Sequence, residues 1–289
     1  MKKKAVAVVM TAVMALGMVS AVSVQAGIED KTLIVGFDAE YPPYGYMDEN
    51  GEYTGFDLEL AQAVCDLEGW ELEKKPINWD SKDMELNSGS IDCIWNGFTM
   101  NGREDDYTFS EPYVDNSQVI VVAEDSGIEK LTDLAGKTVG VQAASAALDL
   151  LQSEEDGGQK ELADTFGALN EFADYNTAFT ELQAGALDAL AIDVGVAKYQ
   201  LNSRGEGFKI LDETLNTEQY AIGFKKGNTE LCDIVNADLQ KLADDGTVAE
   251  LAEKDEIADM VTLKASDDAS AEDSKDATDD AETDKTEEK

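Results

Sequence analysis

Histidine is absent from this 289-residue chain, arginine occurs twice, and cysteine occurs three times. Histidine is the commonest general base near neutral pH and a frequent ligand of transition metals. Its absence argues against Ser-His and Cys-His catalysis, and it leaves open enzymes that use carboxylates alone. The cysteines Cys65, Cys93 and Cys232 have no CxxC spacing and can close at most one disulfide. The sequence therefore indicates neither a metal site nor a cofactor.

Basic residues are few in relation to acidic ones. The chain has 22 lysines and arginines against 62 aspartates and glutamates, which gives a formal net charge of −40 at pH 7. A surface of this sign repels nucleic acid and anionic lipid headgroups, so we expect no nucleic-acid partner. A local pocket can still oppose the field of the whole protein and bind a small zwitterion.

The N-terminal residues are typical of an export signal. Three lysines at positions 2–4 precede an apolar run at 5–22, and a small-residue motif at 24–26 fits a cleavage site before Gly27. The sequence predicts a signal peptide at residues 1–26, the alternative being a retained membrane anchor. No later stretch is apolar enough to cross a membrane. We therefore expect a chain secreted across the cytoplasmic membrane, periplasmic or associated with the cell surface.

The C-terminal segment, residues 265–289, has eleven acidic residues and three lysines among alanine, serine and threonine. It has no large apolar residue that could offset the entropy lost on ordering. We expect a disordered acidic tail that acts as a solubilising spacer. The alternative is an arm that binds cations or a partner.

Between these ends, apolar patterns of strand type and helix type alternate. The predicted strands are 33–37, 71–77, 91–95, 118–123, 138–141, 187–192 and 220–224, and the main predicted helices are 57–67, 144–151, 177–184, 194–201, 230–243 and 248–257. This alternation predicts α/β structure with a mainly parallel sheet. The pattern restarts near residue 117, which indicates two lobes and a cleft. Ligands of open α/β sheets lie at the carboxyl ends of strands, so the residues that follow each strand are the candidates for a site.

Two of these candidates carry charge. Arg103 lies a few residues after the predicted strand 91–95, and Gly97 and Thr99 lie between them. A guanidinium binds a carboxylate with two parallel hydrogen bonds. The alternative role of Arg103 is a surface salt bridge to the acidic run at 104–106. Asp193 ends another strand, where a carboxylate can pair with an ammonium group or can cap the helix that begins at the next residue.

Two further candidates are weaker. Ser145 begins a helix, where free N–H groups bind anions, although serine at this position is more often only a cap. Tyr41 lies in a loop made rigid by two adjacent prolines, and it either faces a ligand or packs beneath the loop. An α-amino acid is the simplest ligand that carries a carboxylate and an ammonium group close together, as Arg103 and Asp193 would require.

These residues occur in motifs that resemble those of the extracellular solute-binding proteins of family 3, the polar amino acid receptors of ABC importers. The resemblance covers nearly all of Lys31 to Ile257. It is carried by Tyr41-Pro42-Pro43-Tyr44, Gly55-Phe56-Asp57-Leu58-Glu59-Leu60, Gly97-Phe98-Thr99 with Arg103, the Leu-Ala-Gly-Lys sequence at 134–137, and Leu187-Asp188-Ala189 up to Asp193.

The resemblance implies a periplasmic-binding-protein fold of type II, in which two Rossmann-like lobes are joined by two crossing strands. The first lobe would comprise residues 27–113 and the return segment 220–264, and the second lobe residues 117–219. The protein would capture a free polar amino acid by hinge closure and deliver it to the permease subunits of an ABC transporter in the membrane. We expect it to be a monomer and not an enzyme.

The resemblance also implies roles for individual residues. Arg103 would bind the ligand carboxylate and Asp193 the amine, Gly97 and Thr99 would add polar contacts, and Ser145 would hold the carboxylate at its helix start.

An aromatic pair, Tyr41 and Trp79, would flank the ligand side chain, with Asp38 nearby, although Trp79 could also be an ordinary core residue. Two other functions remain open. One is a carboxylate-using, dehydratase-like enzyme on the same scaffold, and the other is the ligand-sensing ectodomain of a receptor.

Overall fold

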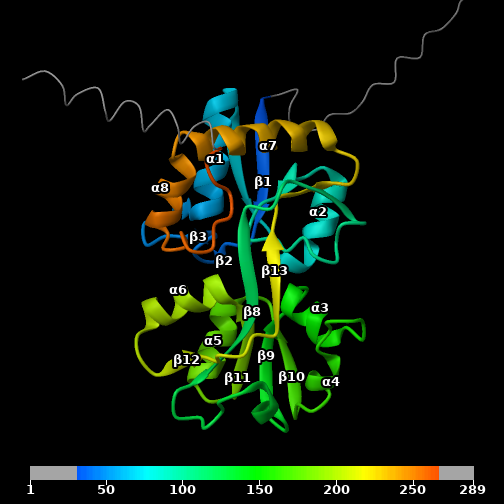
Figure 1. Cartoon of the computed structure of the whole chain (residues 1–289), viewed down its shortest axis with the longest axis vertical. Coiled ribbons are helices and arrows are strands. Elements are labelled where there is room, and N and C mark those ends of the chain that lie inside the picture. Colours follow the sequence, from blue (N-terminus) through cyan, green and yellow to red (C-terminus); the bar gives the residue numbers. More distant parts are fainter. Residues whose placement is uncertain (1–30, 267–289) are drawn as a thin grey trace, which may run out of the picture.

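The computed structural model describes residues 31–266. The predicted signal peptide and all but the first two residues of the predicted acidic tail lie outside the described residues. The described chain forms two α/β lobes that follow one another along the long axis of the molecule (Figure 1). Between residues 31 and 266, no helix combines the length and the apolar character that a membrane span requires.

The first lobe is built on a five-stranded mixed sheet in the order β5-β1-β6-β14-β7. Strands β1 (Thr32–Phe37), β5 (Glu71–Pro76) and β6 (Cys93–Ile94) are parallel, whereas β14 (Gly223–Lys225) is antiparallel to both β6 and β7 (Tyr107–Phe109). A small antiparallel sheet lies beside it, formed by β2 (Glu40–Tyr41), β3 (Gly45–Met47) and β4 (Tyr53–Thr54). The helices of this lobe are α1 (Phe56–Glu68), α2 (Lys82–Ser88), α7 (Thr229–Asp244) and α8 (Thr247–Lys254), with a short 3-10 helix at Trp79–Ser81.

The second lobe contains the sheet β10-β9-β11-β8-β12. Strands β9 (Thr138–Gln142), β10 (Ala168–Phe172) and β11 (Ala189–Asp193) are parallel, and β8 (Val114–Ala123) is antiparallel to β11 and to β12 (Phe208–Ile210). The helices are α3 (Ala146–Gln152), α4 (Lys160–Ala163), α5 (Tyr175–Gln183) and α6 (Val194–Arg204), and a 3-10 helix spans Leu131–Leu134. The expected α/β architecture is confirmed, with antiparallel strands added to each parallel core.

Two antiparallel strands connect the lobes. Strand β8 and strand β13 (Asn216–Tyr220) run side by side from one lobe to the other (Figure 1), with Val114 opposite Tyr220 and Gln118 opposite Asn216. The prediction of one strand at 220–224 is wrong, because β13 ends at Tyr220 and β14 begins at Gly223 in a different sheet. The second crossing between the lobes is made by β13, whose residues Asn216–Tyr220 are mostly polar and show no apolar strand pattern.

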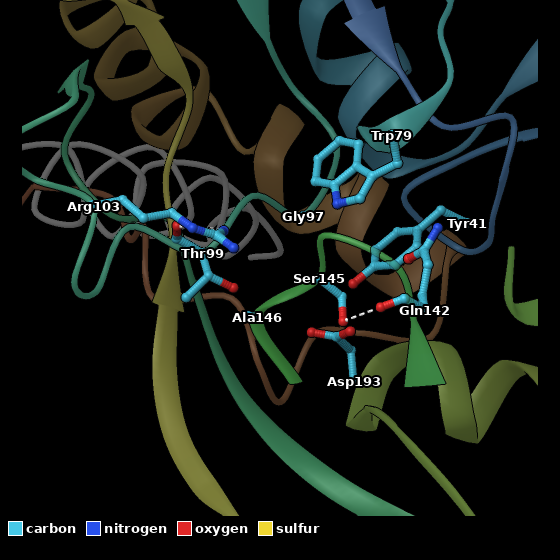
Figure 2. Close-up of a pocket in the computed structure, with 9 residues that line it drawn as sticks. All are labelled: Tyr41, Trp79, Gly97, Thr99, Arg103, Gln142, Ser145, Ala146 and Asp193. Carbon is cyan, nitrogen blue, oxygen red and sulfur yellow. Dashed lines mark hydrogen bonds between the residues drawn. The ribbon is translucent and has the colours of Figure 1, made fainter. Parts of the chain in front are cut away.

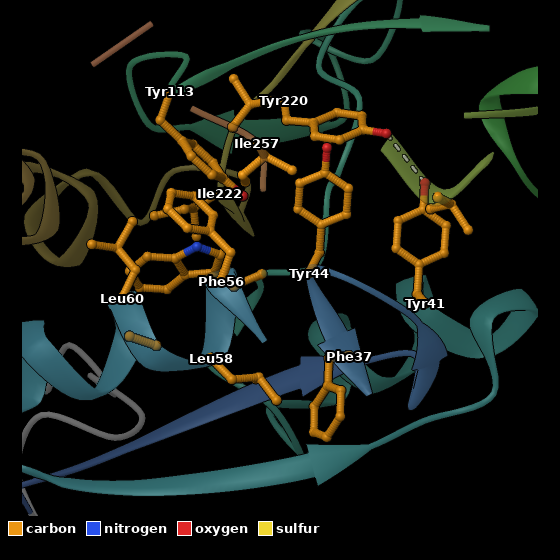
Figure 3. Close-up of a cluster of buried hydrophobic side chains, with 14 of the residues drawn as sticks. Phe37, Tyr41, Tyr44, Phe56, Leu58, Leu60, Tyr113, Tyr220, Ile222 and Ile257 are labelled. Carbon is orange, nitrogen blue, oxygen red and sulfur yellow. Dashed lines mark hydrogen bonds between the residues drawn. The ribbon is translucent and has the colours of Figure 1, made fainter. Parts of the chain in front are cut away.

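Helix α1 illustrates how the sequence forms the core of the first lobe. Its apolar residues Phe56, Leu60 and Val64 recur every four residues and are buried on one face, and Leu58 is buried on another side of the helix. The helix ends at Gly69, whose φ of 67° is in the left-handed region that glycine adopts without strain. Figure 3 shows Phe56 near Tyr113 and Leu58 on the side of Phe37 of β1. The three cysteines are buried and free.

Candidate functional site

A pocket lies between the two lobes and contains both charged residues that the sequence singles out. Its lining residues come from both lobes and are Tyr41, Trp79, Gly97, Thr99, Arg103, Gln142, Ser145, Ala146 and Asp193 (Figure 2). Seven of the eight residues proposed from the sequence line it. The eighth, Asp38, does not line the pocket, but it accepts a hydrogen bond from the pocket residue Gln142.

Arg103 belongs to the first lobe and reaches the second. Its guanidinium donates from Nη2 to Asp149 Oδ2 of helix α3 at 2.7 Å and from Nη1 to the carbonyl of Thr99 at 3.3 Å. The guanidinium also lies over the ring of Phe98, 5.1 Å from its centroid. Among the described residues its salt-bridge partner is Asp149, and the alternative pairing with the acidic run at 104–106 does not occur. The Arg103 side chain is 13% exposed and that of Asp149 is 64% exposed, so the carboxylate of this ion pair lies largely in solvent.

Asp193 is at the N-cap position of α6, but its side chain makes no capping bond. Its Oδ1 instead accepts from the hydroxyl of Tyr220 at 2.7 Å and from the side-chain amides of Gln118 at 2.6 Å and Asn116 at 2.8 Å. The hydroxyl of Tyr175 is 3.3 Å from Oδ2. The capping alternative is therefore wrong, and neutral donors hold this buried carboxylate in the pocket wall.

A second carboxylate lies next to Asp193. Glu218, on strand β13, is 5% exposed, and its Oε1 accepts from the same two amides, Asn116 at 2.8 Å and Gln118 at 2.7 Å. The hydroxyl of Thr99 also donates to this oxygen, at 2.8 Å. Burial and the charge of Asp193 raise the pKa of Glu218 to about 7.

Gly97 supports the site through its backbone. Its φ is 56°, and a Cβ at this position would lie 2.9 Å from the rings of both Tyr41 and Tyr220. Its N–H donates to Asp57, a buried residue of α1 that also accepts from Tyr113 at 2.8 Å. Glycine is therefore required here by the conformation and by the two tyrosine rings.

The two predicted aromatic residues line the pocket and are also packed against other rings. The hydroxyl of Tyr41 is 3.2 Å from that of Tyr220, and Figure 3 marks this contact. Trp79 meets Phe98 edge to face at 5.7 Å between ring centroids, and the Nζ of Lys82 lies 5.1 Å from its ring. Packing of this kind fixes the orientation of the rings that face the pocket.

Ser145 caps helix α3, which is the second of the two roles that the sequence suggests for it. Its hydroxyl accepts from Leu148 N at 3.1 Å and donates to the carbonyl of Gln142 at 2.8 Å, the bond drawn in Figure 2. The side chain of Gln142 donates to Asp38 Oδ2 at 2.6 Å. Burial raises the pKa of Asp38 to about 6.

Side chains from the two lobes meet across the cleft at several points. In addition to Arg103–Asp149 and Gln142–Asp38, Lys82 donates to the carbonyl of Ala144 at 3.1 Å. Lys82 is 5% exposed, and Ala144 has a φ of 54°, which is unusual for a residue other than glycine. These contacts hold the lobes together around the pocket.

Sequence reasoning missed several residues of this site. Gln142 and Ala146 line the pocket, and Gln142 directly follows the predicted strand 138–141, so the rule that ligands lie at the carboxyl ends of strands could have found it. The set around Asp193 had no such signal, because Asn116, Gln118 and Glu218 lie on the connecting strands. Within residues 31–266, no group of three or more cysteine or acidic side chains is arranged to hold a metal ion.

Comparison with known proteins places the chain in a family. Residues 33–254 match the model of the bacterial extracellular solute-binding proteins, family 3. The chain is 34% identical over 228 residues to the arginine-binding extracellular protein ArtP of Bacillus subtilis, covering 78% of this chain and 86% of that protein.

Solved structures agree with this match. The substrate-binding protein of an ABC uptake transporter from Streptococcus pneumoniae, solved with bound histidine, superposes with a TM-score of 0.76 at 33% identity and covers 81% of this chain and 96% of that one. An ancestral amino acid-binding protein, a precursor of cyclohexadienyl dehydratase, superposes with a TM-score of 0.71 at 31% identity, covering 79% of this chain and 96% of that one.

Proposed function

The chain belongs to the bacterial extracellular solute-binding proteins of family 3, and from that membership we propose that it captures a free polar amino acid by closing its lobes and delivers it to the permease of an ABC importer. The observation that carries this proposal is one pocket with a guanidinium and a carboxylate in its wall. Arg103 comes from the first lobe and Asp193 from the second. A zwitterion bound to both would bridge the lobes.

Each end of the amino acid has a partner of opposite charge in this proposal. The guanidinium of Arg103 has donors beyond those that bind Asp149 and Thr99, so it can hold the α-carboxylate while it keeps its contact with the second lobe. Asp193 accepts the α-ammonium group. Because the Ser145 hydroxyl donates to Gln142, backbone N–H groups at the start of α3 would face the carboxylate in its place.

The side chain of the amino acid would lie between Tyr41 and Trp79, whose rings are fixed by their own packing partners. Asp38 would act through Gln142, to which it is hydrogen-bonded. The relative that is named for arginine makes L-arginine the first candidate ligand.

Closure would occur by movement of the second lobe, residues 117–219, against the first lobe, residues 27–113 and 220–264. The connecting strands β8 and β13 would bend during this movement and act as the hinge. The contacts across the cleft from Lys82, Arg103 and Gln142 support this proposal, because they require the lobes to be close. The permease would recognise the closed form, and the protein would act as an exported monomer without nucleic acid or cofactor.

A thermal-shift screen of the twenty amino acids tests the function, with isothermal titration calorimetry for each positive result. We expect at least one polar amino acid to raise the melting temperature and to bind with one site per chain, because a ligand that binds only the folded state stabilises it. Failure of all twenty to bind would overturn the proposal.

An enzyme that uses carboxylates is the second candidate function. It is supported by one similar structure, that of an ancestral amino acid-binding protein that is a precursor of a dehydratase. Mass spectrometry after prolonged incubation distinguishes the two functions. We expect the bound amino acid to be recovered unchanged, and turnover in proportion to protein concentration would favour the enzyme.

A further inference from the structure

Glu218 and Asp193 form a pair of buried carboxylates at the point where the connecting strands meet the second lobe. One oxygen of each accepts from the same two amides, those of Asn116 and Gln118, which brings Oε1 of Glu218 close to Oδ1 of Asp193. Neither carboxylate has a salt bridge to a lysine or arginine among residues 31–266. Two adjacent buried carboxylates without a cation cannot both be ionised at low cost.

Glu218 also determines what the hydroxyl of Thr99 can do. Thr99 lines the pocket, and its Oγ1 donates its proton to Glu218 Oε1 at 2.8 Å. A hydroxyl has a single proton, so toward the pocket Thr99 offers only lone pairs. Lone pairs attract an ammonium group and repel a carboxylate.

We propose that Glu218 is a positioning residue of the ligand site, which fixes Thr99 as an acceptor for the ligand ammonium group and releases a proton to solvent when that group binds. This inference rests on the proposed function, because it requires a ligand with an ammonium group. Before binding, the proton on Glu218 keeps the pair at one negative charge. After binding, the ammonium group supplies the positive charge and both carboxylates are ionised.

The groups that face Glu218 favour this exchange. They are Asp193 from the end of β11, the amides of Asn116 and Gln118 from β8, the hydroxyl of Thr99, and the phenols of Tyr220 on its own strand, of Tyr175 on α5 and of Tyr44 between β2 and β3. Asp193 supplies the nearby negative charge and the others are neutral at pH 7, so the pKa of Glu218, raised to about 7, would fall when an ammonium group enters.

The sign of the pH dependence follows from this pKa. Below about pH 7 the free protein holds the proton, which binding must remove, so affinity falls as pH falls, by up to about tenfold for each pH unit. Near neutral pH we expect release of part of a proton per ligand, since burial and the charge of Asp193 raise the pKa of Glu218 and leave it partly protonated in the free protein.

Calorimetry in two buffers with different ionisation enthalpies measures this proton release. The probe is L-arginine, or the amino acid that binds most tightly in the screen if arginine does not bind, with histidine and cysteine left out because their side chains titrate in or near this range. We expect proton release in the wild type and its loss in Glu218→Gln. Binding without proton release, or undiminished release in Glu218→Gln, would overturn the inference and leave the proposed function intact. Absence of any amino acid binding would overturn both.

Asp92→Asn is the matched control. Asp92 is 5% exposed, burial raises its pKa to about 6, and it accepts from Ile34 N away from the pocket, so proton release should persist in this variant. Loss of the release in Asp92→Asn would contradict the assignment to Glu218.

Infrared difference spectra of the wild type keep the inference testable if Glu218→Gln does not fold. At about pH 6 the probe should remove the carbonyl band of a protonated carboxyl group, since Glu218 is protonated there before binding. An unchanged band in that spectrum would count against the inference.

Discussion

At the scale of single residues, Arg103 is the proposed partner of the ligand carboxylate. It is one of two arginines in the chain, and its guanidinium is held by Thr99, Phe98 and Asp149 at the edge of the pocket. We predict that Arg103→Ala weakens amino acid binding by about 3–5 kcal/mol, because it leaves the ligand carboxylate buried without its partner. Titration calorimetry measures the loss.

The second arginine supplies a control for that prediction. Arg204 is at the end of α6, where it donates to the side chains of Gln200, Gln183 and Asn176. Arg204→Ala removes the same charge and should leave the affinity within about threefold of the wild type, as expected of a site without contact with the ligand. Equal losses in the two variants would show that net charge, and not Arg103, determines binding.

At the scale of elements, helix α2 begins with a lysine that connects the lobes. Lys82 donates to the carbonyl of Ala144 without lining the pocket. We predict that Lys82→Met weakens binding about fivefold, because about 1 kcal/mol of closed-state hydrogen bonding is lost while the apolar stem is kept. Affinity measurements would test this, and Lys75→Met is the control, since Lys75 bonds to Glu85 and Ser90 within the first lobe. An unchanged affinity in Lys82→Met would refute a role in closure.

The elements also show where sequence reasoning succeeds. The bounds of strands β1 and β9 and of helices α1 and α7 agree with the predicted ones within about two residues. Each of these elements packs on the core of a single lobe, so its apolar residues recur at the spacing of a strand or a helix. Strand β13 was missed because Asn216-Thr217-Glu218-Gln219 is polar. Its pairing with β8 depends on residues about a hundred positions distant in the sequence, and Glu218, its buried polar residue, bonds to side chains of β8, so the local sequence pattern contains no signal for this strand. Glu218 was missed for the same reason.

At the scale of the whole molecule, burial of carboxyl groups should make the fold most stable in mild acid. Burial raises the pKa of Asp38, Asp92 and Asp255 to about 6 and of Asp57 and Glu218 to about 7. A raised pKa means that the folded state binds protons more tightly than the unfolded state. The resulting stability is complete below about pH 4 and is lost as pH rises through 6 and 7.

We therefore predict a melting temperature several degrees higher at pH 5 than at pH 8, since about 1 kcal/mol corresponds to roughly 2–4 °C for a chain of this size. Differential scanning calorimetry without ligand provides the measurement. Hydrogen bonds lower the pKa of Asp48 and Glu85, so these groups reduce the stability of the fold as pH falls. Their effect appears only below the usual carboxyl pKa, outside the range from pH 5 to pH 8. A melting temperature that rises from pH 5 to pH 8 would contradict the burial of these carboxyl groups.

The central claim is that the pocket binds both charged ends of one small molecule, and calorimetry on three related ligands tests it most directly. The ligands are the amino acid that the screen identifies, its deaminated acid and its decarboxylated amine. We predict that each analogue binds at least about thirtyfold more weakly than the amino acid, because each leaves Asp193 or Arg103 without its partner, at a cost of about 2 kcal/mol or more. An analogue that binds as tightly as the amino acid would contradict the account.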